Sequence, residues 1–162
     1  MNNHLQDLLE VITVGLPFCV FKLVTGKLLL FDIGLPVTGG ILLVLGFMDL
    51  IINLVNVGFL IAKHRRGAGI CTMTFLVGLF EGRAGRPSAR LTEVAAALDV
   101  ILSFILVVVM INAGLLAGLP RTEILMWNIA VSFNVIGAGY AQLSRAIRKL
   151  NDGDRQGAAT GQ

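Results

Sequence analysis

Charge is scarce in this chain. Charged residues make up 14% of its 162 residues and hydrophobic residues 56%, whereas soluble proteins have about 25% charged residues. The mean hydropathy is +0.83. A water-soluble core explains this composition poorly, because too few polar side chains remain to cover it. The sequence instead predicts an all-α integral membrane protein, with a single domain over residues 1–150.

Residues that carry chemistry are also few. The histidines, His4 and His64, lie outside the long apolar stretches, so none of these stretches offers an axial haem ligand. Cys19 and Cys71 have no metal-binding or redox spacing and are most simply small buried hydrophobes. No Gly-rich phosphate loop or nucleophile motif is present. The sequence therefore predicts a protein that is not an enzyme and holds no metal or cofactor.

Four apolar stretches reach the length of about 20 residues that a membrane-spanning helix needs. We expect spans at about 11–31, 37–62, 93–116 and 124–143, arranged as two hairpins. A shorter apolar stretch at 68–80 would be about 20 Å long as a helix, less than the hydrocarbon thickness of about 30 Å. We expect it to be an interfacial or re-entrant segment. Residues 151–162 are predicted to form a disordered cytoplasmic tail.

Basic residues gather on one side of these predicted spans. Ten Lys and Arg residues fall on that side and two, Lys27 and Arg121, on the other. Lys and Arg accumulate in cytoplasmic loops, so both termini are expected in the cytoplasm, most simply of a bacterium whose inner membrane holds the protein. The bias also explains the net charge of +3 without nucleic acid. A basic face that could contact anionic lipid or a cytoplasmic protein is formed by Lys63, Arg65, Arg66, Arg83, Arg86, Arg90, Arg145, Arg148 and Lys149.

Opposite charges lie within the first two predicted spans. Either Lys22 or Asp49 alone at mid-bilayer would cost about 2.5–3.5 kcal/mol, and both lie at similar depths from the turn between the spans, so we expect an ion pair. Asp49, Asn53 and Asn56 are spaced i, i+4 and i+7, which places them on one helix face. This stripe is either a polar path for a proton, ion or solute, or a set of interhelical hydrogen bonds worth about 0.6–2 kcal/mol each.

The third predicted span holds Asp99 and Ser103, four positions apart and near its cytoplasmic end. We expect Asp99 to be solvated or paired with an arginine there. Gly114 and Gly118 form a small-xxx-small pattern, which is typical of close helix crossings.

Polar residues also interrupt the fourth predicted span. Asn128 and Ser132 share a helix face, whereas Asn134 points elsewhere. Trp127 is expected to be an interfacial anchor. Several faces of this helix therefore need a protein partner or water.

Two functions are compatible with these features. The first is a non-catalytic subunit of a larger membrane complex, with an assembly, scaffold or docking role, in contact with the bilayer and other membrane subunits. The alternative is a small ion or solute transporter or channel protomer that uses a polar path around Lys22, Asp49, Asn53 and Asn56. The absence of catalytic motifs and the polar residues on several helix faces favour the first.

Overall fold

The computed structural model describes residues 8–9, 11–63, 71–81 and 89–160, and these ranges are helical with no strand. The chain is thus all-α. Two π-helical segments flank the first α-helix, and a short 3-10 helix precedes the last. The elements are η1 (Val11–Gly15), α2 (Leu16–Lys27), η2 (Leu28–Asp32), α3 (Pro36–Lys63), α4 (Thr72–Glu81), α5 (Ala89–Asn112), η3 (Leu115–Gly118) and α6 (Arg121–Thr160).

Three helical stretches are long and apolar enough to cross a membrane: Val11–Asp32, Pro36–Ala62 and Arg90–Asn112. Their length and composition indicate a membrane-embedded protein. They correspond to the first three predicted spans, although the third ends at Asn112 because Gly114 adopts a left-handed conformation, with φ of 67°. The fourth predicted span, 124–143, lies within α6 but is not among the candidates found in the described residues, so a fourth crossing stays a prediction.

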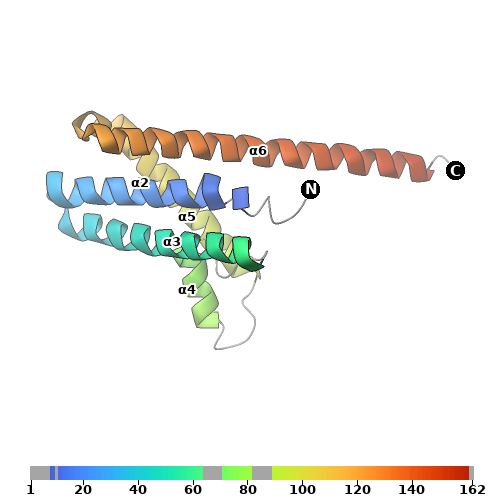
Figure 1. The fold of residues 1–162 in the computed structure, drawn as a ribbon, viewed down its shortest axis with the longest axis horizontal. Coiled ribbons are helices and arrows are strands. Elements are labelled where there is room, and N and C mark those ends of the chain that lie inside the picture. The colour runs from blue at the N-terminus through green and yellow to red at the C-terminus, as the bar shows by residue number, and fades with distance from the viewer. Residues whose placement is uncertain (1–7, 10, 64–70, 82–88, 161–162) are drawn as a thin grey trace.

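The helix α2 is the centre of the fold and contacts α3, α5 and α6. In Figure 1, α2 lies between α3 and α6, while α5 crosses these three helices diagonally. The helices α2 and α3 pack against each other on either side of a turn at Gly34 (φ of 78°). The predicted layout of two hairpins is not confirmed, because α5 and α6 diverge and each packs against α2.

Glycines allow α2 and α3 to approach closely. A Cβ atom on Gly39 would lie 2.5 Å from the backbone nitrogen of Leu30 and 2.7 Å from the carbonyl oxygen of Gly26. Farther along, a Cβ atom on Gly46 would lie 2.9 Å from the side chain of Leu23. The backbones of α2 and α3 are therefore in contact. This close approach places the polar stripe of α3 (Asp49, Asn53 and Asn56) directly against α2.

Aromatic packing fastens α6 to α2. Trp127 is 2% exposed and its ring centroid lies 4.8 Å from that of Phe21. Both side chains belong to a core with Phe18 and with Met110 of α5. The prediction that Trp127 is an interfacial anchor is wrong, because its ring fills the space between helices.

The last helix continues to Thr160 and extends beyond the other helices (Figure 1). The sequence instead predicts a helix end at Asn151–Gly153 and a disordered tail. No proline interrupts this stretch. A single glycine costs a helix about 1 kcal/mol relative to alanine, which is too little by itself to end a helix.

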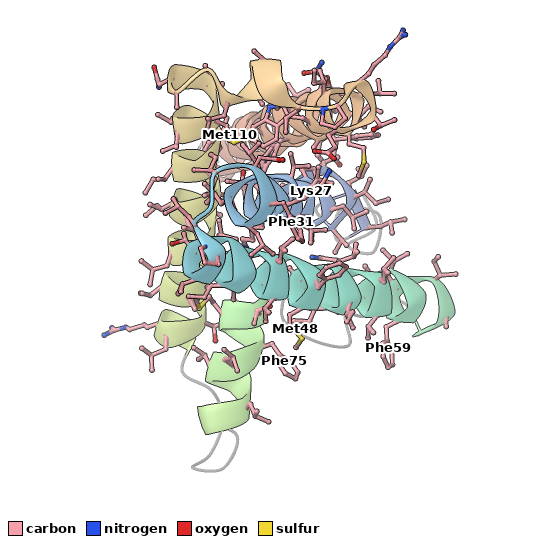
Figure 2. The ribbon with its side chains drawn as sticks, turned by 90° about the vertical axis from the view of Figure 1, so that its left-hand side faces the viewer. Lys27, Phe31, Met48, Phe59, Phe75 and Met110 are labelled. Atoms are coloured by element: carbon pink, nitrogen blue, oxygen red, sulfur yellow. The ribbon has the colours of Figure 1, made fainter. Side chains whose placement is uncertain are left out.

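The helix α4 lies within the predicted segment 68–80, of which residues 68–70 are outside the described residues. Its 10 residues rise about 15 Å, too short to cross a bilayer. Figure 2 shows α4 projecting from the bundle below α3. An interfacial or re-entrant position is consistent with this length.

Candidate functional site

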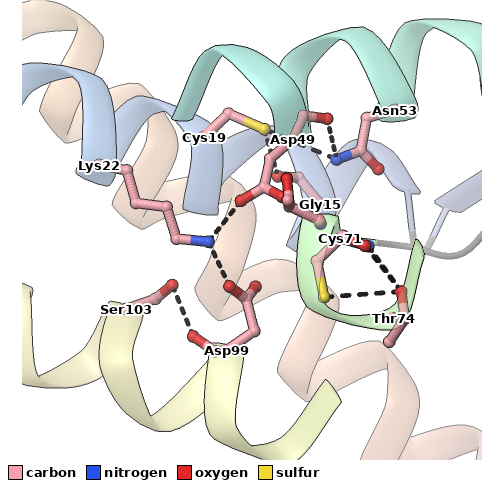
Figure 3. Close-up of polar contacts among 10 residues, drawn as sticks. Gly15, Cys19, Lys22, Asp49, Asn53, Cys71, Thr74, Asp99 and Ser103 are labelled. Carbon is pink, nitrogen blue, oxygen red and sulfur yellow. Dashed lines mark hydrogen bonds and ion pairs between the residues drawn. The ribbon is translucent and has the colours of Figure 1, made fainter. Parts of the chain in front are cut away.

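A buried network of charged side chains joins three helices. The ammonium of Lys22 on α2 forms ion pairs with Asp49 on α3 and with Asp99 on α5 (Figure 3). The exposed fractions are 1% for Lys22, 2% for Asp49 and 6% for Asp99. The predicted pairing of Lys22 with Asp49 is confirmed. We call these three residues the ion network.

Asp99 is the part of the ion network that sequence reasoning misplaced. Its predicted solvation or pairing with arginine is wrong, because it is buried against Lys22. The helix α5 crosses α2 diagonally (Figure 1). Asp99 pairs with Lys22, which lies near the middle of α2. Ser103, which is fully buried, donates a 2.9 Å hydrogen bond to the carbonyl oxygen of Asp99 and so bonds within its own helix.

The start of α4 supplies a further partner to the ion network. The backbone N–H of Thr72 donates a hydrogen bond to Oδ1 of Asp49, whose Oδ2 contacts Lys22. The first N–H groups of a helix lack partners within the helix and favour negative charge. Asp49 therefore satisfies an unpaired donor of α4, and α4 in turn stabilises a carboxylate that would otherwise face apolar surroundings.

Hydrogen bonds between Cys71 and Thr74 cap the start of α4. Thr74 Oγ1 accepts a 3.1 Å hydrogen bond from the N–H of Cys71 and donates a 2.8 Å bond to the carbonyl oxygen of Cys71. Burial, and secondly the charge of Asp99, raise the pKa of the Cys71 thiol. Sequence reasoning missed Cys71, Thr72 and Thr74 as parts of the site. The two threonines are a sequence signal for a helix start, but nothing local indicates that this start faces Asp49.

The polar stripe of α3 is buried rather than open. Asn53 donates a 2.9 Å hydrogen bond to the carbonyl oxygen of Asp49 and lies 3.6 Å from the sulfur of Cys19. Its Oδ1 atom has no partner among the described residues and faces Gly15, where a Cβ atom would lie 2.4 Å away. Asn56 is fully buried. The structure thus brings the stripe to the α2–α3 contact.

The polar residues of α6 lie apart from the ion network. Asn128 and Ser132 are exposed, and the Ser132 hydroxyl donates a 2.8 Å hydrogen bond to the carbonyl oxygen of Asn128. They line a groove of about 280 Å³ with Ile129, Phe133 and Ile136.

Asn134 lies on another side of α6, as the sequence predicts. It is partly buried, and its amide nitrogen has no hydrogen-bond partner within the described part of the chain. Polar groups on α6 therefore face more than one direction.

The predicted glycine crossing motif is wrong. Gly114 and Gly118 lie after the end of α5, and a Cβ atom on either would meet nothing within 4 Å. The left-handed Gly114 ends the helix, so the pair forms a turn rather than a helix-packing face.

The predicted basic face is described only in part. Lys63 ends α3, and Arg90 lies in the first turn of α5 with its side chain exposed. Arg65, Arg66, Arg83 and Arg86 lie outside the described residues, as do the side chains of Arg145, Arg148 and Lys149 on α6.

An ion pair at the other end of α2 was also missed. Lys27 pairs with Glu123 in the first turn of α6. The sequence shows Glu123 only as an acid that favours a helix start. The pair adds a polar contact to the aromatic packing between α2 and α6.

The chemistry of the ion network follows from its charges. One ammonium faces two carboxylates, and within the described residues no group of three His, Cys, Asp or Glu side chains could hold a metal ion. The arrangement can fasten three helices together, and it can exchange a proton. No protein family model, curated protein or solved structure matches the chain.

Proposed function

We propose that the protein is a non-catalytic subunit of a larger membrane complex, with a scaffold or docking role. The exposed polar face of α6 carries this proposal, because the Asn128 amide lies among exposed apolar side chains such as Ile129 and Ile136, whereas the neighbouring Ser132 hydroxyl bonds within the helix. A polar group without a partner costs several kcal/mol in hydrocarbon. A helix of another membrane subunit would supply the partner that lipid cannot supply.

The closed interior supports the same function. The ion network lies between packed helices, and its three side chains are almost inaccessible to solvent. Removing one partner of a buried ion pair is strongly destabilising. In the proposed scaffold, the ion network fixes how α2, α3 and α5 cross, and this crossing sets the outer surface that partners meet.

The proposed topology has four spans, with 124–143 of α6 as the fourth. It places both termini on the cytoplasmic side of a bacterial inner membrane, with α4 as a re-entrant helix whose first turn reaches Asp49 near the middle of α3. The ten-to-two distribution of Lys and Arg supports it. The basic face would then meet anionic lipid headgroups or a cytoplasmic protein.

Purification from native membranes in a mild detergent tests the subunit role. We expect unlike membrane proteins to co-purify in a fixed ratio. Asn128→Leu combined with Ser132→Ala should reduce their recovery several-fold, whereas Ile136→Leu on the same groove should not. Isolation of a homo-oligomer alone, with no unlike chain, would contradict the proposal.

A small transporter or channel protomer is the second candidate, and the charge imbalance of the ion network favours it. Two carboxylates around one ammonium can accept a proton, and ionisable groups within a membrane often mark ion or proton pathways. Reconstitution into liposomes with an enclosed pH dye tests this function. We expect proton flux that Asp99→Asn abolishes; equal leakage with and without the protein would contradict this candidate.

A further inference from the structure

The two ends of the segment 71–79 differ in burial. Cys71, Thr72 and Thr74 are 4%, 6% and 6% exposed, whereas Leu79 is 58% exposed. The helix α4 contacts α5 and, less extensively, α3. In Figure 2 the helix projects away from the bundle. Among the described side chains of this segment, the most buried ones therefore lie at its start.

The first turn of α4 is attached to the ion network by a specific bond. The Thr72 N–H donates a hydrogen bond to Asp49 Oδ1, and Lys22 contacts Asp49 Oδ2. One carboxylate therefore binds both Lys22 of α2 and the start of α4. A hydrogen bond to a charged group is stronger than one between neutral groups. Loss of the charge on Asp49 would weaken the attachment of α4 directly.

We propose that α4 is a latch that covers the ion network and opens when the Thr72–Asp49 hydrogen bond is lost. In the closed state, the first turn of α4 buries the Cys71 thiol. In the open state, Cys71, Lys22 and both carboxylates become accessible to water from the side where α4 lies. The latch follows from the contacts of α4 alone and is independent of the subunit role proposed above.

Labelling of the two native cysteines can measure the opening of the latch. Cys19 lies inside α2 and is fully buried, so it reports loosening of the whole bundle, whereas Cys71 reports the first turn of α4. The full-length protein in detergent micelles is treated with N-ethylmaleimide, and labelling at each cysteine is followed by mass spectrometry. Because a raised thiol pKa slows the reaction by itself, each variant is compared with the unmodified protein at the same near-neutral pH.

Two substitutions act on the bond from opposite sides, one by weakening it and the other by removing it. Asp49→Asn removes the charge of the acceptor, and Thr72→Pro removes the donor N–H at a first-turn position where proline is tolerated. Either change should increase the labelling rate of Cys71 about tenfold or more, with the rate at Cys19 unchanged. Thr72→Pro leaves all three charges in place, so it tests the latch even if Asp49→Asn fails to fold.

Matched controls separate the latch from general instability. Thr72→Ala keeps the N–H, and Glu123→Gln removes a carboxylate from the ion pair with Lys27 at the other end of α2. Both should leave the labelling rate at Cys71 within about twofold of that in the unmodified protein. Hydrogen–deuterium exchange should show faster exchange in the first turn of α4 only for Thr72→Pro and Asp49→Asn. Equal rises at Cys19 and Cys71, or no rise in Thr72→Pro, would overturn the proposal.

Discussion

Lys22 of α2 and Asp99 of α5 form a buried ion pair across 77 positions of sequence. Because the same ammonium also contacts Asp49, the two carboxylates depend on one cation. Each member of this network therefore has a different energetic role, and this difference can be measured.

Removal of Lys22 should be the most damaging change to the ion network. Lys22→Met leaves two buried carboxylates side by side with no cation, and loss of one partner of a buried pair costs about 3–5 kcal/mol in soluble proteins. Asp99→Asn leaves one ammonium paired with one carboxylate and should cost clearly less. Thermal unfolding in detergent measures both. Equal losses of stability would contradict this prediction, because Asp99 would then contribute as much to the stability of the protein as Lys22 does.

Combined substitutions test whether the network acts as a unit. Lys22→Met with Asp49→Asn still leaves Asp99 buried and unpaired, so this double variant should remain unstable. Adding Asp99→Asn removes the last unpaired charge and should recover part of the lost stability. If the three effects simply add in unfolding experiments, the residues do not interact.

Neighbouring glycines of α3 should respond in opposite directions. Gly39→Ala places a Cβ atom against the backbone of Leu30, and such overpacking typically costs about 1–3 kcal/mol. Gly40→Ala meets nothing within 4 Å and should be neutral or stabilising by about 0.5–1 kcal/mol, because alanine favours helix more than glycine does. Unfolding in detergent compares the two; equal effects would contradict the close α2–α3 contact.

The single tryptophan of the chain reports the packing of α6 on α2. Because Trp127 is almost fully buried, its fluorescence should be weakly quenched by acrylamide, unlike that of a tryptophan at the membrane interface. Trp127→Ala should destabilise the protein by about 3–5 kcal/mol. The exposed Leu125 is the control, and Leu125→Ala should have a much smaller effect. Strong quenching in the native protein would show that Trp127 is exposed.

The proposed topology makes a prediction for intact cells. Single cysteines placed at Thr122 and at Gln156, in a background without the native cysteines, should react with a membrane-impermeant reagent from opposite sides. Thr122 should react from outside and Gln156 only after the membrane is opened. Reaction of both from one side would rule out α6 as a spanning helix.

The sequence alone determined the all-α class, the placement of three apolar helices and the pairing of Lys22 with Asp49. Such features are readable because span length, helical periodicity and depth within one hairpin depend on residues that are close in sequence. The charge bias likewise predicts an orientation without any knowledge of packing.

The tertiary structure decided which distant groups meet. Asp99 pairs with Lys22 because α5 crosses the bundle diagonally, and Thr72 bonds to Asp49 because α4 docks by its first turn. Trp127 is buried because α6 packs on α2 rather than forming a hairpin with α5. Helix crossing and docking arise from the fit of whole surfaces, which no local pattern of residues encodes.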